Sequence, residues 1–149
     1  MADIEETTSI AGSPGQVWAV LGDFGNIARW ASNVDHSCLT TQDSEGVGAE
    51  RRVQVGRNAL LERVVEWQPG ERLAYRIDGL PPVMRSVVNT WVLAGGAGST
   101  SVTLRTHVDA GPRPPQQVLA HGFAKVLAKA SREMLGGLKQ HIEQGEVAR

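Results

Sequence analysis

Six segments in the middle of this chain alternate apolar and polar side chains, and this alternation constrains the fold more than any other feature of the sequence. The side chains of a β-strand point to opposite faces in turn, so a period of two predicts strands with one face in the core. Short breaks rich in Gly, Pro, Asn or Asp separate the segments, which predicts hairpins of antiparallel strands. We place the strands near residues 36–42, 49–56, 59–67, 72–78, 85–93 and 100–109.

The segment before these strands contains a helix that breaks in an unusual place. Residues 4–10 can form a first strand, and Ser13 and Pro14 then begin a helix as its N-cap and first helical residue. The helix stops at the sequence "GDFG", and a second short segment ends at Trp30. A helix that only had to cover a sheet would continue. We therefore expect two short helices folded around something, such as the mouth of a pocket.

After the last strand, residues 115–144 have the periodicity of one long helix. Apolar side chains recur along one face of it from Leu119 to Ile142. Gly136 and Gly137 lie inside this helix, where each weakens it by about 1 kcal/mol relative to Ala, and we expect them to mark a bend. The complete order of elements predicts an α+β fold, in which a curved seven-stranded antiparallel sheet carries the long helix on one face.

The bulk composition is that of an ordinary globular protein in one domain, residues 1–149. With 15 basic and 16 acidic residues the net charge is −1, so no strong field favours binding to nucleic acid. No run approaches the roughly 18 apolar residues needed for an integral membrane segment, and the N-terminus lacks the pattern of a signal peptide. Together with the single Cys38, these features predict a cytoplasmic protein, either a monomer or a homodimer.

No pattern in the sequence indicates a metal ion or a cofactor. The histidines do not cluster, and Cys38 has no second cysteine with which to form a metal site. A nucleophilic pair of Cys38 and His36 would need an orienting third group, which the sequence does not supply. Two glycine-rich stretches do not open a helix after a strand, as a phosphate-binding loop does. We expect neither a metal nor a cofactor.

The hairpins divide the strand residues between two faces. With residues 57–58 as a two-residue turn, Arg51 lies opposite Val64 and is a diagonal neighbour of Glu62. A three-residue turn would instead place Arg63 beside Arg51. We prefer the first register because it pairs unlike charges.

The face predicted to contact the long helix is apolar with a few polar insertions, which are Arg51, Glu62, Tyr75, Asn89 and Thr106. An ionised side chain buried without partners costs several kcal/mol, so a face that served only for packing would avoid one. An apolar surface with a few convergent polar groups is typical of a pocket for a small molecule. Three apolar residues fall on the polar face in this register: Leu61, Val65 and Trp67.

The chain resembles a known family through four stretches, "SPGQVWAVLGDFGNIARW", "GVGAERRV", "LLERVVEWQPGERLAYRI" and "TSVTLRTHVD". In this order they are similar to the polyketide cyclase/dehydrase-like branch of the START-like (SRPBCC), helix-grip superfamily. The resemblance implies a sheet that grips the long helix, a cavity between the two, and two short helices near the entrance. It also implies that Trp30, Arg51, Glu62 and Tyr75 lie in this cavity or at its rim. The family includes lipid and hormone carriers and aromatic polyketide cyclases.

Strand faces, helix stripe and resemblance together define a set of candidate ligand-binding residues. On the long helix, the wall opposite the sheet would be formed by Phe123, Leu127, Ala130 and Met134. The alternative for every aromatic candidate is ordinary core packing, and for Arg51 and Glu62 it is a structural ion pair. The set is Trp30, Arg51, Val53, Glu62, Val64, Tyr75, Asn89, Trp91, Thr106, Phe123, Leu127 and Met134.

Three functions compete for such a cavity. The first is binding or transport of a small hydrophobic molecule, such as a lipid, polyketide or isoprenoid. The second is a polyketide cyclase/aromatase or dehydratase, with Glu62 as the base and Arg51 and Tyr75 polarising carbonyls. The third is a structural role with no ligand. We favour binding because a carboxylate held by arginine is a poor base near neutral pH, an argument that requires Arg51 and Glu62 to be close together.

Overall fold

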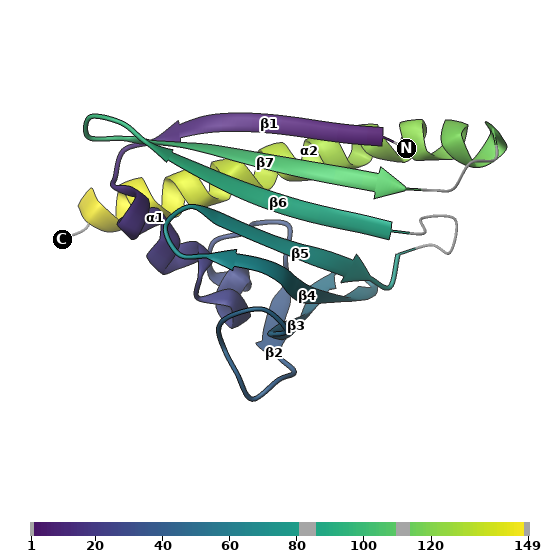
Figure 1. The fold of residues 1–149 in the computed structure, drawn as a ribbon, viewed down its shortest axis with the longest axis horizontal. Coiled ribbons are helices and arrows are strands. Elements are labelled where there is room, and N and C mark those ends of the chain that lie inside the picture. The colour runs from purple at the N-terminus through teal and green to yellow at the C-terminus, as the bar shows by residue number, and fades with distance from the viewer. Residues whose placement is uncertain (1, 81–85, 110–113, 148–149) are drawn as a thin grey trace.

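The computed structural model describes residues 2–80, 86–109 and 114–147, and the side chains of residues 3–80, 86–109 and 125–144. One seven-stranded antiparallel sheet carries a long helix on one face, so the predicted α+β architecture is confirmed (Figure 1). The elements are β1 (Ala2–Ile10), α1 (Pro14–Leu21), the 3₁₀ helix η1 (Phe24–Arg29), β2 (His36–Leu39), β3 (Glu50–Val55), β4 (Asn58–Gln68), β5 (Arg72–Asp78), β6 (Ser86–Gly95), β7 (Thr100–Asp109) and α2 (Pro114–Val147).

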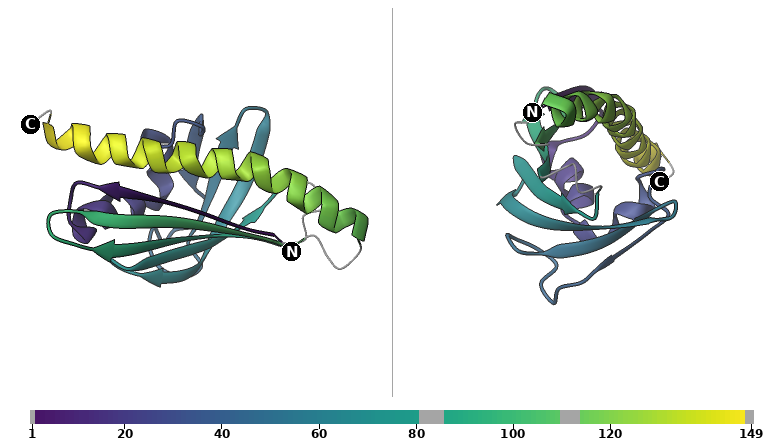
Figure 2. Two further views of the ribbon diagram at one scale, coloured as in Figure 1. Left: turned by 90° about the horizontal axis from the view of Figure 1, so that it is seen from above. Right: turned by 90° about the vertical axis from the view of Figure 1, so that its right-hand side faces the viewer.

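The strands follow the order β1-β7-β6-β5-β4-β3-β2, so the first strand joins the last one and every other neighbour is a hairpin or short connection. Figure 2 shows the sheet curving around α2, which runs along its concave side. The helix lies against β1 and β7. Two contacts connect the helix to β1. Arg132 forms an ion pair with Glu6 at 2.9 Å, and Lys139 donates a hydrogen bond to the carbonyl of Ser9 at 2.5 Å.

Ser13 is the N-cap of α1, as the sequence predicts, and it forms a reciprocal hydrogen-bonded cap with Gln16. The backbone N–H of Gln16 donates to the Ser13 hydroxyl at 3.2 Å, and the Ser13 N–H donates to the Gln16 side chain at 2.7 Å. The helix ends at Gly22, and η1 begins two residues later. A Cβ at Gly25 would lie 2.7 Å from Leu39, so the second glycine of "GDFG" allows η1 to lie against β2.

The two glycines expected to bend α2 have different roles. The helix is continuous over both of them. A Cβ at Gly137 would lie 2.3 Å from the carbonyl oxygen of Trp30, whereas a Cβ at Gly136 would meet nothing within 4 Å. Gly137 therefore lets the helix backbone touch the end of η1, and this contact is why the two short helices lie beside the long one.

The turn between β3 and β4 lies one residue earlier than the sequence predicts, at Gly56 and Arg57. Gly56 has a φ of +59°, which suits the first position of a two-residue hairpin turn. The pairing moves by two residues as a result, and Arg51 lies directly opposite Glu62 rather than diagonal to it. A shift of two keeps every side chain on the face expected for it.

The hairpin of β6 and β7 is shifted in the same way. Its loop spans residues 96–99 rather than 94–99, so Asn89 pairs with Thr106, and Trp91 pairs with Leu104. The parity of the predicted inner face again survives, and Asn89 and Thr106 now lie side by side.

A β-bulge accounts for one of the three apolar residues that the sequence places on the polar face, Trp67. The pairing of β4 with β5 shifts after Val64, so Val65 is the extra residue. The bulge turns Trp67 toward the core, where its ring meets that of Trp18 edge-on at a centroid distance of 5.0 Å. Leu61 and Val65 remain exposed on the outer face.

We expect Gly137→Ala to lower the free energy of unfolding and Gly136→Ala to raise it. The substitution at 137 forces the backbone of α2 away from Trp30, with a loss of about 1–3 kcal/mol. The substitution at 136 enters open space and gains helix propensity, worth about 1 kcal/mol. Chemical denaturation of the two variants measures both values. A gain in stability at both positions would contradict the close approach at Gly137.

Candidate ligand-binding pocket

A buried ion pair joins β3 to β4 on the inner face of the sheet. The Nε of Arg51 lies 2.7 Å from Oε1 of Glu62, and the two residues are 2% and 6% exposed. Because they are directly opposed in the register, no backbone distortion is needed to bring them together. Glu62 is thus held by an arginine within hydrogen-bonding distance, which is the condition that the preference for binding over catalysis requires.

Arg51 also holds the break between the two short helices. Its Nη1 donates to the carbonyl oxygen of Phe24 at 2.9 Å. The guanidinium carbon lies 3.8 Å from the centre of the Phe24 ring and 4.6 Å from that of the Tyr75 ring, so the cation is covered by two aromatic faces. Aromatic contacts, a carbonyl and a carboxylate together satisfy this buried charge.

A second polar network crosses β5, β6 and β7. The indole N–H of Trp91 donates to the Tyr75 hydroxyl at 3.1 Å, and the Asn89 amide donates to the same oxygen at 3.4 Å. The Thr106 hydroxyl donates to Oδ1 of Asn89 at 2.6 Å. Burial raises the pKa of the Tyr75 phenol, and the nearby Glu62 carboxylate raises it further. Tyr75 is therefore a neutral hydrogen-bonded core residue.

A pocket of about 370 Å³ lies between the sheet and α2, and we call it the central pocket. Strands β3 to β7, the chain after η1 and one face of α2 contribute to its walls. Its lining is mainly aliphatic, with a small number of polar side chains. The described lining residues are Ile27, Asn33, Val34, Val53, Val55, Asn58, Leu60, Glu62, Ile77, Gly79, Leu80, Asn89, Thr106, Val126, Leu127, Ala130, Ser131 and Met134.

The structure brings half of the candidate residues to the central pocket. Those that line it are Val53, Glu62, Asn89, Thr106, Leu127 and Met134.

The other candidates lie behind the wall of the pocket or cannot be placed. Trp30 and Trp91 pack edge-to-face against each other with their ring centres 5.7 Å apart, and neither lines the central pocket. Phe123 lies outside the residues whose side chains are described. Buried residues that do not line the central pocket are Trp30, Arg51, Val64, Tyr75 and Trp91.

Several lining residues were not among the candidates. Val55, Leu60 and Ile77 have the same strand parity as Val53, which is a signal that would have selected them. Asn33 and Ser131 belong to no pattern that the sequence offers. Oδ1 of Asn33 is buried and accepts no hydrogen bond from any described residue.

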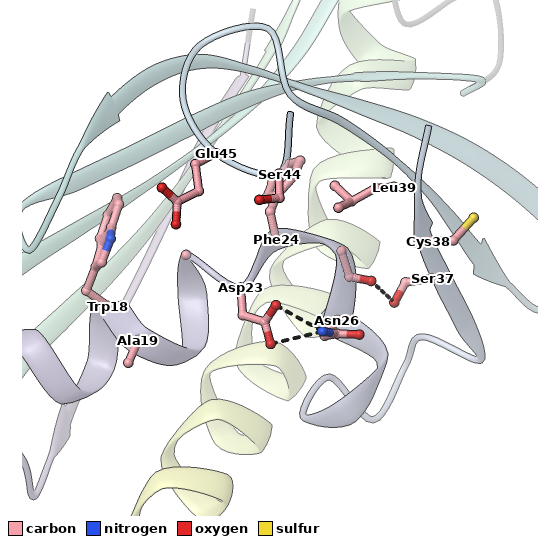
Figure 3. Close-up of a pocket in the computed structure, with 12 residues that line it drawn as sticks. Trp18, Ala19, Asp23, Phe24, Asn26, Ser37, Cys38, Leu39, Ser44 and Glu45 are labelled. Carbon is pink, nitrogen blue, oxygen red and sulfur yellow. Dashed lines mark hydrogen bonds between the residues drawn. The ribbon is translucent and has the colours of Figure 1, made fainter. Parts of the chain in front are cut away.

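A second pocket of about 490 Å³ lies on the surface between the two short helices, β2 and the loop that follows it (Figure 3). Its polar groups largely satisfy one another. The Asn26 amide donates to both oxygens of Asp23 at 2.9 and 3.0 Å, and the Ser37 hydroxyl donates to the Gly25 carbonyl at 2.9 Å. Cys38 is exposed on its edge. We call this the surface pocket, and its internal hydrogen bonds make it a weaker candidate than the central pocket.

Within the described part of the chain, no three His, Cys, Asp or Glu side chains are grouped closely enough to hold a metal ion. None of the helices in that part is both long and apolar enough to span a membrane.

The sequence of residues 1–143 matches the family described as polyketide cyclase / dehydrase and lipid transport. The chain belongs to this family. The predicted resemblance is therefore confirmed. No curated protein matches the chain.

Solved structures share the fold at low sequence identity. A protein from Thermobifida fusca is 23% identical with a TM-score of 0.80, and the match covers 97% of this chain and 95% of that one. A second structure with this fold is the di-domain ARO/CYC BexL from the BE-7585A biosynthetic pathway. It is 17% identical with a TM-score of 0.78, and the match covers 96% of this chain and 47% of that one. The Aha1 dimer from Colwellia psychrerythraea is 15% identical with a TM-score of 0.70, covering 96% and 97% of the two chains.

We expect Arg51→Ala to destabilise the protein by about 3–5 kcal/mol, because it leaves the Glu62 carboxylate buried without its partner. The matched control is Arg63→Ala. Arg63 forms an ion pair with Glu50 at 3.2 Å on the outer face, where its side chain is 57% exposed, and its loss is expected to cost at most about 1 kcal/mol. Denaturant titration compares the two variants. Similar losses of unfolding free energy in the two variants would show that the buried pair contributes no more to stability than the exposed pair.

We expect Tyr75 to remain protonated in the folded protein at pH values where an unfolded tyrosine has ionised. It is the single tyrosine of the chain, so the ultraviolet absorbance of tyrosinate reports on it alone. Its pKa is raised in the folded state, so its contribution to stability is complete below about pH 10 and is lost as the pH rises toward the folded value. An absorbance titration with and without denaturant tests this. Ionisation near pH 10 in the native protein would contradict the buried network.

Proposed function

We propose that this protein binds a small, largely hydrophobic molecule in the central pocket, as a carrier or binding protein. The observation that supports this most directly is the pocket itself, which lies where sheet and helix would otherwise pack together. It combines aliphatic walls with a few polar side chains, the composition expected of a small-molecule site. The family description includes lipid transport, and lipid, polyketide and isoprenoid molecules all fit this chemistry.

A polyketide cyclase/aromatase or dehydratase is the alternative. Two observations favour it: Glu62 lines the central pocket, and BexL, a structural neighbour, is an ARO/CYC protein. Cyclisation with loss of water needs groups that accept and donate protons at the reacting atoms. Glu62 is held by Arg51 at 2.7 Å, and the Tyr75 hydroxyl, which accepts from Trp91, does not line the pocket. These contacts favour binding over catalysis.

We expect Ala130→Phe to abolish binding of the co-purified molecule and Ala19→Phe to leave it intact. Ala130 lines the central pocket, where a phenyl ring would occupy the ligand's space, and Ala19 lines the surface pocket. The measurement is native mass spectrometry of protein purified from its own host, followed by identification of any small molecule released on denaturation. Circular dichroism of both variants checks that each is folded.

The two variants also separate the two pockets. Loss of the ligand in Ala19→Phe alone would place the site at the surface pocket and overturn the proposal. A wild-type protein that carries no molecule would count against a tight carrier, and a poly-β-keto substrate would then be tested with Glu62→Gln, the variant expected to be inactive if Glu62 is the base.

A further inference from the structure

The described residues that line the central pocket carry a negative charge and no positive charge. Among its described lining residues Glu62 is the single charged side chain, and none is lysine, arginine or histidine. Oε1 of Glu62 accepts from Arg51, while no described residue donates to Oε2. The carboxylate therefore presents an unoccupied acceptor at the wall of the pocket.

The positive charge that compensates Glu62 does not reach the ligand space. Arg51 is 2% exposed and is absent from the pocket lining. Its Nε and Nη1 are committed to Glu62 and to the Phe24 carbonyl, and the rings of Phe24 and Tyr75 cover its faces. The ion pair thus acts as a dipole whose negative end faces the pocket.

Two other side chains of the lining, Asn33 and Thr106, also have acceptor capacity left. Oδ1 of Asn33 is buried without a donor from the described residues. The Thr106 hydroxyl donates its hydrogen bond to Oδ1 of Asn89 at 2.6 Å, so the lone pairs of its oxygen can accept a hydrogen bond from a ligand. Buried acceptors of this kind are costly unless a donor reaches them, and a ligand can supply that donor.

We propose that the natural ligand is a neutral hydrophobic molecule that carries a hydrogen-bond donor, in particular a hydroxyl group, and that the pocket selects against carboxylates. This inference rests on the proposed function. A hydroxyl group would donate to Oε2 of Glu62 or to Oδ1 of Asn33. A fatty acid or other carboxylate would bring a second negative charge beside Glu62 with no cation in the lining to receive it.

Three probes of nearly equal shape test the proposal: β-naphthol, its methyl ether and β-naphthoate. Isothermal titration calorimetry at neutral pH measures the dissociation constant of each. We expect β-naphthol to bind at least about tenfold more tightly than the ether, because only the naphthol donates to a charged acceptor. We expect β-naphthoate to bind most weakly of the three.

The outcomes distinguish this inference from the proposed function. If naphthoate binds as tightly as naphthol, or the ether as tightly as naphthol, the donor preference is overturned while the binding function stands. If none of the three binds and Ala130→Phe behaves as wild type toward the co-purified molecule, the central pocket is not the site and both proposals fail.

Glu62→Gln is the decisive variant. It removes the negative charge and leaves the guanidinium uncompensated, so naphthol should lose its advantage and naphthoate should gain at least about tenfold in affinity. Glu50→Gln is the matched control, since Glu50 pairs with Arg63 on the outer face, and it should keep the wild-type order. An unchanged order in folded Glu62→Gln overturns the proposal.

Asn33→Ala gives a second test should Glu62→Gln fail to fold. Because Oδ1 of Asn33 has no donor from the described residues, its removal breaks no hydrogen bond that they supply. We expect the naphthol to ether ratio to fall in this variant. A ratio equal to that of the wild type, together with equal wild-type binding of naphthol and the ether, overturns the proposal without use of Glu62→Gln.

Discussion

The guanidinium of Arg51 is the constraint on which the rest of the structure depends. It is a permanent charge in an apolar interior, and leaving it without partners would cost several kcal/mol. Its partners come from three parts of the chain: the Glu62 carboxylate on β4, the Phe24 carbonyl at the start of η1, and the Tyr75 ring on β5. A slip of β3 by two residues would preserve the hydrophobic pattern but break the ion pair. The charge therefore specifies a register that hydrophobic burial alone leaves open.

The same interaction ties the segment after the "GDFG" break to the sheet. The carbonyl of Phe24, the first residue of η1, accepts from Nη1 of Arg51 at 2.9 Å. The break also allows two close approaches that any side chain would block, Gly25 to Leu39 and Gly137 to Trp30. The short helices are thus attached to the sheet through Arg51 and to α2 through a glycine, and they close one end of the space between sheet and helix (Figure 2).

Strand faces could be predicted from the sequence, while the registers of the β3–β4 and β6–β7 hairpins could not. Alternation of apolar and polar residues fixes which side chains share a face, and it is unchanged by a shift of two, so Arg51, Glu62, Asn89 and Thr106 were assigned to the inner face in the wrong pairings. Turn chemistry holds the missing information: Gly56 with φ +59° marks the first turn residue. The bulge at Val65 and the positions of Asn33 and Ser131 depend on tertiary packing. No local sequence pattern predicts these features. The resemblance to a family predicted a cavity between sheet and helix, but it did not indicate which polar groups face that cavity.

That distinction decides the chemistry of the central pocket. From the inner-face assignment alone, Arg51 and Glu62 are equal candidates to meet a ligand, and the pocket would accept either a carboxylate or a hydroxyl group. Direct pairing removes this symmetry, because the Phe24 and Tyr75 rings and the Phe24 carbonyl hold the arginine under η1, outside the pocket lining, while Glu62 remains in the lining. One buried ion pair can therefore stabilise the register and, through the end that it exposes, set the polarity of the site. Changes in the aliphatic walls would alter the shape of an accepted ligand, but reversing its polarity would require a change in the pair on which the sheet depends.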